Sequence, residues 1–414
     1  MLFGGLLAAC PRGGGGGPKP PSGIGWSLGA DVLGESPVRG VALVPDGVKS
    51  VVVTSDARVR RIAESGALAW TRDVGASAGV VGIDGDVALV AVGGAGSTSV
   101  AVPSLAGALR GEPGAALVAL DLGTGDVRWA VGAGSTRWAI VSAVQPSGGG
   151  DGFLVGGSFA GTLRMGALTV TAAGGGDGFV ASVDRSGGVR WLRRMGGDSA
   201  DAVAGVVSLG GGRFAMAGTF TGPAELGDSE LVALADKTLA ADVFVAVFEA
   251  DGRLAWSRTF GGAREDTCAG LAALAGGAVA VAGTVRGEVD VAGRRFDARG
   301  AADGVVAVFA PDASVRSAWL VGGEDFDGIT AMGTGGAAAD QLVLAGWFTG
   351  SLPSGERADG IDDVFLSVGP AAGPGTIVPM PASSPASTTA LTVTASGYAV
   401  ALHSEKPTLH VRGF

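Results

Sequence analysis

The chain has 414 residues, 29 of them basic and 39 acidic, which gives a formal net charge of −10 with only 16% of residues charged. This balance argues against a nucleic-acid partner, because binding phosphates requires clustered Lys and Arg. Glycine is extreme at 77 residues, yet hydrophobic residues make up 47% of the chain. The composition therefore predicts a large packed core rather than a disordered Gly-rich chain.

The first ten residues, 1–10, end in Leu7-Ala8-Ala9-Cys10, which resembles the lipobox of bacterial lipoproteins. In these proteins the signal peptide is removed before the Cys, whose thiol is then acylated. Residues 11–23 are rich in Gly and Pro and have the composition of a flexible tether. We therefore expect a cell-envelope protein held at a membrane only by a lipid on Cys10. The apolar run is short and follows no Lys or Arg, so a disordered N-terminus of a cytosolic protein is the alternative.

Four sequence markers recur after residue 23 at intervals of about 60 residues. A Trp ends one apolar run, and the intervals between its successive copies at Trp70, Trp129, Trp191 and Trp256 are 59, 62 and 65 residues. A Gly pair follows this run, an Asp opens another run, and a Gly-x-x-x-Gly element ends a third. These markers are Gly196-Gly197, Gly261-Gly262 and Gly322-Gly323; Asp177, Asp242, Asp303 and Asp363; and residues 157–161, 218–222, 283–287 and 346–350.

Each repeat holds four short apolar runs separated by turns, which predicts one four-stranded blade of a β-propeller. Seven inner strands are expected to begin near residues 38, 79, 139, 202, 267, 328 and 390. The extra length between the second and third strands, at 223–241 and 288–302, predicts a hairpin or long loop on the outer part of the blade. The last repeat lacks an outer strand, which residues 24–28 can supply with Trp26 in the repeat position.

The sequence thus predicts one all-β domain, residues 24–414, that forms a seven-bladed propeller closed by an N-terminal strand. Over residues 139–368 the marker order resembles the bacterial β-propeller repeat family of exported proteins and lipoproteins. Residues 119–129 instead resemble the quinoprotein-type propeller repeat, which also occurs in lipoprotein propellers that help assemble outer-membrane proteins. A quinone cofactor is not expected, because this Trp motif appears once and no adjacent Cys pair exists.

Three acids, Asp201, Asp266 and Asp327, each stand four residues after the second Gly of a pair and directly before an inner strand. Gathered at one mouth of the channel they would suit Ca²⁺, which prefers oxygen ligands. The other interpretation is that each Asp accepts hydrogen bonds from the amides of its own turn. The turn interpretation is favoured, because Val80 and Ala139 occupy corresponding positions and have no ligand atom. The series from Asp177 to Asp363 is interpreted in the same way.

The tryptophans divide into two groups. Those in the repeat position are expected to pack between blades (Trp26, Trp70, Trp129, Trp191, Trp256 and Trp319). Trp347 is off that register, and with Phe348 it is a candidate stacking face for a sugar or a peptide. His403 and His410 form a poor metal pair, and Cys268 is expected to be a buried small residue. No catalytic motif of the Gly-x-Ser-x-Gly, His-Glu-x-x-His or phosphate-loop type occurs.

These patterns predict a monomeric, non-enzymatic lipoprotein whose propeller binds an envelope protein or a glycan. Two alternatives stay open. One is a scaffold for outer-membrane protein assembly, which would need an exposed strand edge for β-augmentation. The other is a hydrolase or lyase, which would need two acids of different blades facing each other in the channel.

Overall fold

The computed structural model describes residues 25–45, 49–94, 112–226, 229–231, 240–336, 340–353, 355, 357–358, 363–380, 387–403 and 406–414. The predicted signal segment 1–10, its Cys10 and the predicted tether 11–23 lie outside the described residues. Within the described part of the chain, no helix is long and apolar enough to cross a membrane.

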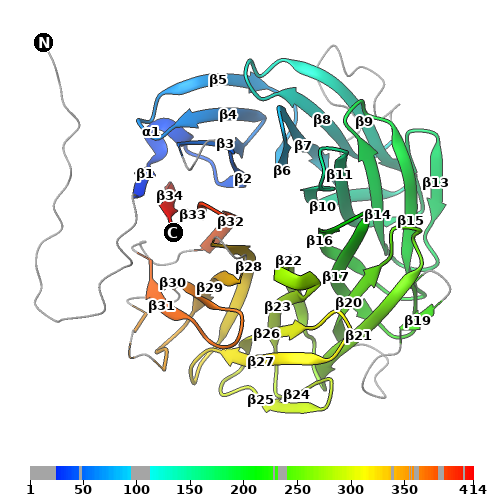
Figure 1. Ribbon diagram of the computed structural model, residues 1–414, viewed down its shortest axis with the longest axis vertical. Coiled ribbons are helices and arrows are strands. Elements are labelled where there is room, and N and C mark those ends of the chain that lie inside the picture. Colours follow the sequence, from blue (N-terminus) through cyan, green and yellow to red (C-terminus); the bar gives the residue numbers. More distant parts are fainter. Residues whose placement is uncertain are drawn as a thin grey trace, which may run out of the picture.

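Seven antiparallel sheets stand side by side around a central axis, so the predicted seven-bladed β-propeller is confirmed (Figure 1). From the axis outward, blade 1 consists of β2 (Val38–Leu43), β3 (Ser50–Ser55), β4 (Arg58–Ala63) and β5 (Leu68–Asp73). Blade 2 consists of β6 (Ala78–Asp84), β7 (Val87–Gly94), β8 (Gly114–Asp121) and β9 (Val127–Ser135). Blade 3 consists of β10 (Trp138–Pro146), β11 (Gly152–Ala160), β14 (Asp177–Asp184) and β15 (Val189–Gly197).

Blades 4 to 7 follow the same order from the axis outward. Blade 4 consists of β16 (Ala202–Gly210), β17 (Arg213–Thr221), β20 (Ala241–Phe248) and β21 (Leu254–Gly262). Blade 5 consists of β22 (Thr267–Ala273), β23 (Val279–Val285), β26 (Asp303–Phe309) and β27 (Val315–Val321). Blade 6 consists of β28 (Asp327–Gly335), β29 (Gln341–Phe348), β30 (Asp363–Pro370) and β31 (Thr376–Pro379). Blade 7 consists of β32 (Ser387–Thr394), β33 (Gly397–His403), β34 (Pro407–Gly413) and β1 (Gly25–Leu28).

The N-terminal strand closes the ring as predicted. β1 pairs antiparallel with β34, so that Trp26 stands opposite Val411, and the short helix α1 (Ala30–Leu33) then leads into blade 1. Leu28 and Leu33 are buried with Leu409 in the cluster between blades 7 and 1. Because blade 7 contains both ends of the propeller, opening the ring requires this sheet to separate.

The extra segments between second and third strands form hairpins, but each hairpin belongs to the sheet of the preceding blade. The hairpin of β12 (Thr162–Met165) and β13 (Leu168–Thr171) pairs with β9, and that of β18 (Ala224–Leu226) and β19 (Ser229–Leu231) pairs with β15. The hairpin of β24 (Glu288–Val291) and β25 (Arg294–Asp297) pairs with β21. Blades 2, 3 and 4 are therefore six-stranded sheets, each completed by a segment of its neighbour.

The core lies between the blades, because alternate residues of a strand point to opposite faces of its sheet. On β17, Phe214 and Met216 pack against blade 3, whereas Ala215 and Ala217 pack against blade 5. Each inner strand carries a β-bulge or register shift. Such bulges increase strand twist locally, and small residues allow the inner strands to lie close together near the axis.

Two of the repeat tryptophans, Trp70 and Trp129, donate a hydrogen bond from their blade to the next one, whereas the buried indole nitrogens of Trp256 and Trp319 have no such partner among the described residues. The Trp70 indole donates a 2.9 Å hydrogen bond to the carbonyl of Leu122 and covers Gly125, whose Cβ would lie 2.6 Å from the ring. Trp129 donates in the same way to the carbonyl of Arg185 and covers Gly187. A glycine is required at these turns, because it has a positive φ and lies directly under the indole.

Candidate functional site

The two ends of the ring differ, since all hairpin inserts leave the blades at the same end. At this end, named the insert face, strands 1 and 3 of each blade begin and strands 2 and 4 end. The opposite end, named the turn face, carries the short connections between strands 1 and 2 and between strands 3 and 4. The candidate site residues from the sequence, namely Asp201, Asp266, Asp327 and Trp347, stand at strand ends on the insert face.

Asp201, Asp266 and Asp327 hold the junctions between blades rather than facing the channel as a ring. Each carboxylate accepts one amide hydrogen bond from the second Gly of the preceding blade. The donors are Gly197, Gly262 and Gly323, at 2.8, 2.6 and 2.5 Å. The other oxygen accepts from the end of strand 2 in its own blade or just beyond it, where Thr221, Arg286 and Thr349 donate at 3.1, 3.0 and 3.1 Å. Each Asp thus connects the outer strand of one blade to the insert of the next.

The Gly pairs are explained by the same junctions. A Cβ on the second Gly, at 197, 262 or 323, would overlap a carbonyl of the adjoining insert: that of Pro223, Glu288 or Ser351. A Cβ on the first Gly, at 196, 261 or 322, would collide with or crowd two carboxylates. The first is the junction Asp, and the second is Asp177, Asp242 or Asp303, which opens strand 3 of the preceding blade. The repeat therefore buries a pair of carboxylates at three successive junctions.

Burial sets the electrostatics of these pairs. The pKa of Asp201 is raised above its ordinary value, mainly because burial penalises the charged form, with Asp177 adding to the rise. Burial likewise raises the pKa values of Asp303 and Asp327. Among the described residues, no group of three or more His, Cys, Asp or Glu side chains is arranged to hold a metal. The three acids that the sequence grouped into a calcium ring are thus held at separate junctions.

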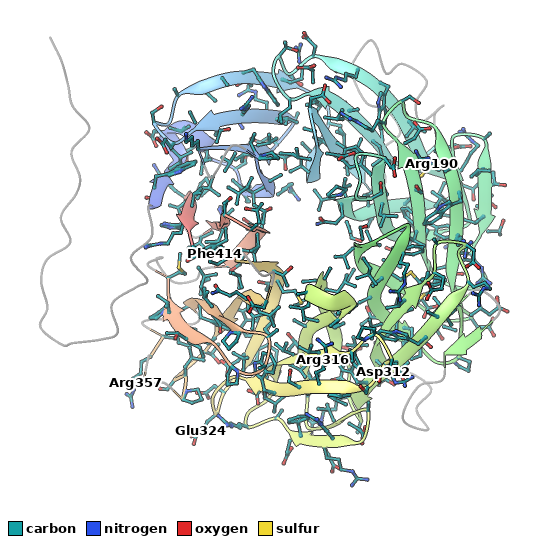
Figure 2. The ribbon with its side chains drawn as sticks, in the orientation of Figure 1. Arg190, Asp312, Arg316, Glu324, Arg357 and Phe414 are labelled. Carbon is teal, nitrogen blue, oxygen red and sulfur yellow. The ribbon has the colours of Figure 1, made fainter. Side chains whose placement is uncertain are left out.

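Trp347 lies in an aromatic cluster on the insert face between blades 5 and 6. Its ring centroid is 4.8 Å from that of Phe326. The guanidinium carbon of Arg286, which belongs to the neighbouring blade 5, lies 5.4 Å from the Phe326 ring centroid. All three side chains are half-buried, and the exposed Glu324 and Asp325 directly precede Phe326. Figure 2 shows Glu324 pointing outward at the periphery of the ring.

Phe348 does not share this surface, so its predicted role as a stacking residue is wrong. It is 0% exposed and packs in the core, with its ring centroid 6.5 Å from that of Phe365. Adjacent residues of a strand point to opposite faces, so Trp347 and Phe348 cannot present one stacking face. Trp347 instead lies in a cluster with Phe326 and Arg286. The position of Phe326 is occupied by Ala200 and Glu265 in other repeats, and the position of Arg286 is occupied by Thr221. That departure from the repeat is the signal from which the sequence could have identified them.

His403, His410 and Cys268 show no sign of a joint site. The residues His403 and Val400 lie three apart on β33, and Val400 pairs with His410, so the two imidazoles point to opposite faces of the sheet. Burial lowers the pKa of His410, and Arg412 adds to this effect. Burial raises the pKa of the Cys268 thiol to about 12, which leaves it protonated and unreactive at neutral pH.

The inner strands around the axis carry few charged residues. The seven inner strands contain one basic residue, Arg39, and two acids, Asp84 and Asp327, both buried at strand ends. Arg39 is exposed, and the other side chains that these strands expose are neutral, such as Ile140, Ser142 and Thr330. The paired acids that a channel hydrolase would need are buried and bonded to main-chain amides instead.

A hollow of about 690 Å³ lies between blades 3 and 4, where β15 meets the turn between β20 and β21. Its lining is mixed, with apolar side chains such as Leu192 and Phe248 beside the charged Arg193, Arg194 and Arg253. Each arginine already has a protein partner: Arg193 donates to the Gly252 carbonyl, Arg194 pairs with Asp177 and Glu225, and Arg253 pairs with Asp251. This hollow therefore does not require an anionic ligand.

Comparison with known proteins gives distant likenesses to solved structures. No protein-family model matches the chain, and no curated protein matches it. BamB from Moraxella catarrhalis is 17% identical with a TM-score of 0.49, over 95% of this chain and 99% of that one. YCF48 from Cyanidioschyzon merolae is 10% identical with a TM-score of 0.47, over 94% and 98%. Quinohemoprotein alcohol dehydrogenase from Comamonas testosteroni is 10% identical with a TM-score of 0.45, over 94% and 76%. Likenesses this distant say nothing about ligands or reactions.

Proposed function

We propose that the chain is a non-enzymatic lipoprotein of the cell envelope, and that its propeller binds a protein or glycan partner through the insert face. The observation that carries this proposal is the cluster of Arg286, Phe326 and Trp347. It combines two half-buried aromatic rings, a guanidinium and neighbouring exposed acids at one junction. Aromatic and Arg side chains are the residues that most often dominate recognition surfaces.

The repeat itself supports a specialised role for this cluster. At the junction of blades 3 and 4 the equivalent positions hold Ala200 and Thr219, and at that of blades 4 and 5 they hold Glu265 and Thr284. At those junctions Asp201 and Asp266 accept the same amide hydrogen bonds as Asp327 does. The fold therefore does not need the aromatic pair. A rigid ring that presents such side chains at the ends of its strands is well suited to binding.

The two alternative functions make different demands on the geometry. A hydrolase needs two carboxylates that reach the substrate, whereas the acids of the described junctions are buried and engaged. An assembly scaffold needs a long free strand edge. Among the outermost strands, β31 and β1 have four residues each and β31 ends in Pro379, whereas β5 has six residues and β27 has seven. The edges of β5 and β27 are therefore the ones at which an assembly scaffold would bind a strand.

Site-specific photo-crosslinking in the native host tests which face binds. A crosslinking residue at position 324 should capture a partner, and the added Trp347→Ala change should remove that product. The matched control is position 316 on the turn face, which should give no such product. Mass spectrometry or glycan analysis of the product then identifies the class of partner. Equal capture from both faces, or capture from position 316 alone, would contradict the proposal.

A further inference from the structure

The junction between blades 5 and 6 buries two carboxylates around Gly322. Asp303 and Asp327 are both 0% exposed. A Cβ on Gly322 would overlap Asp303 Oδ1 and lie 3.0 Å from Asp327 Oδ2, so these two oxygens lie close to one point. Asp303 Oδ2 accepts a 2.6 Å hydrogen bond from the Arg299 amide, but Asp303 Oδ1 has no hydrogen-bond partner among the described residues. A buried oxygen thus faces a second carboxylate with nothing to compensate it.

The equivalent junction of blades 3 and 4 shows how the fold supplies the missing charge. There Asp177 and Asp201 flank Gly196 in the same way. Arg194 Nη1 lies 2.8 Å from Asp177 Oδ2 and donates a 3.0 Å hydrogen bond to the carbonyl oxygen of Gly196. A cationic group therefore occupies the space beside the carboxylate and the glycine carbonyl.

Blade 5 has no arginine at the equivalent position. The residue two positions before the Gly pair is Arg194 in blade 3, and Leu320 takes its place in blade 5. Leu320 packs with the apolar cluster between blades 4 and 5. The cationic side chain that acts on Asp303 is that of Arg299, which is exposed, and its effect is smaller than that of burial. The pair therefore keeps two buried carboxylates, and within the described part of the chain no guanidinium is hydrogen-bonded to Asp303.

Two buried charges of the same sign are unfavourable unless a counter-charge or a proton joins them. Donors that are all oxygen atoms favour a hard cation, and Ca²⁺ binds carboxylate and carbonyl oxygens at about 2.3–2.6 Å. Two oxygens on one Ca²⁺ can lie up to about 5 Å apart, and the shared neighbour Gly322 keeps Asp303 Oδ1 and Asp327 Oδ2 within that range. A divalent ion would neutralise the pair completely.

We propose that Asp303 and Asp327 form a cation site, with Ca²⁺ as its best match. The site corresponds to the place that the Arg194 guanidinium occupies two repeats earlier, in blade 3. The two carboxylates supply the charge, and main-chain oxygens such as that of Gly322 complete the ligand set. The site lies at the same junction as the proposed partner surface, since Asp327 directly follows Phe326, but its test requires neither the lipid anchor nor a bound partner. Its role is to hold blades 5 and 6 together.

Thermal melting of the full chain, with equilibrium dialysis against Ca²⁺, tests this site. After treatment with EDTA at pH 7, Ca²⁺ should raise Tm by about 3 °C or more, bind at one ion per chain, and exceed the effect of Mg²⁺. Asp303→Asn should remove this response, whereas Asp312→Asn on the exposed turn of blade 5 should keep it. Leu320→Arg should give a folded protein that no longer responds to Ca²⁺, because the guanidinium replaces the ion.

Two outcomes would overturn the proposal. One is a Ca²⁺ response that survives in both Asp303→Asn and Leu320→Arg. The other is a wild-type protein that ignores Ca²⁺, with a Tm that rises as the pH falls from 7 to 5 in EDTA. The second result would mean that a proton bridges the pair, because a carboxyl whose pKa is raised by folding stabilises the native state as it becomes protonated. Circular dichroism confirms that each variant is folded before it is compared.

Discussion

At the scale of single residues, the paired glycines and the buried acids of the repeat act together to connect neighbouring blades. Gly322 leaves room for two carboxylates, Gly323 donates its amide to one of them, and Asp327 connects two blades through that bond. The sequence predicted the structural role of this Asp from its position after the Gly pair. It could not predict the buried pair with Asp303, because the two residues belong to neighbouring blades and meet only when the ring forms.

Gly322→Ala should destabilise the propeller. The added methyl would overlap Asp303 and crowd Asp327, and overpacking of a closed site costs about 1–3 kcal/mol. The measurement is the free energy of unfolding from urea titration. Gly373→Ala is the control, because no atom lies within 4 Å of the added Cβ; a loss as large as that of Gly322→Ala would contradict the steric account.

Acid should weaken blade 7 through His410. Burial holds the pKa of this imidazole below its usual value of about 6.5, so below that pH the unfolded chain binds a proton that the native state resists. Stability is therefore expected to fall as the pH decreases from about 6.5 towards the lower native pKa. Melting curves at pH 7.5 and 5.5 should show a smaller loss for His410→Leu than for the wild type. An equal loss in both proteins would assign the effect to other groups.

At the scale of elements, the strands follow from local pattern but their partners do not. The starts of all seven inner strands were predictable, because Gly, Asp and Ser turns mark them and short apolar runs follow. The hairpin between β23 and β26 was also predictable as an extra segment, whereas its pairing with β21 in blade 4 was not. This pairing depends on the close approach of Gly262 in blade 4 to the Glu288 carbonyl of the hairpin. The repeat pattern in the sequence does not show which segments of neighbouring blades come close together.

Replacing residues 288–297 by a short turn should make the protein aggregate. The change removes β24 and β25, exposes the outer edge of β21 and deletes the buried Val289 and Val291. Unpaired strand edges recruit other chains, so light scattering at rising protein concentration should show association that the wild type lacks. A monodisperse variant with unchanged Tm would show that this hairpin does not protect the edge.

At the scale of the whole molecule, the ring depends on strands from both ends of the propeller. Deleting residues 24–29 removes β1 and leaves the outer edge of β34 unpaired. We expect a marked fall in Tm, because the buried Leu28 is lost from the seam between blades 7 and 1. Deleting residues 2–9 is the control and should leave Tm unchanged. A shortened propeller that melts like the full chain would contradict closure by β1.

The proposed location in the cell envelope also concerns the whole molecule, because a propeller anchored to a membrane by a lipid meets different partners from one in the cytosol. The most direct test is membrane fractionation with intact-mass measurement, on protein expressed from its native upstream region beside a Cys10→Ala variant. The proposal predicts a diacyl or triacyl mass on Cys10 and a membrane location for the wild type, with both lost in the variant. Two soluble, unmodified proteins would contradict it and would place the propeller in another compartment.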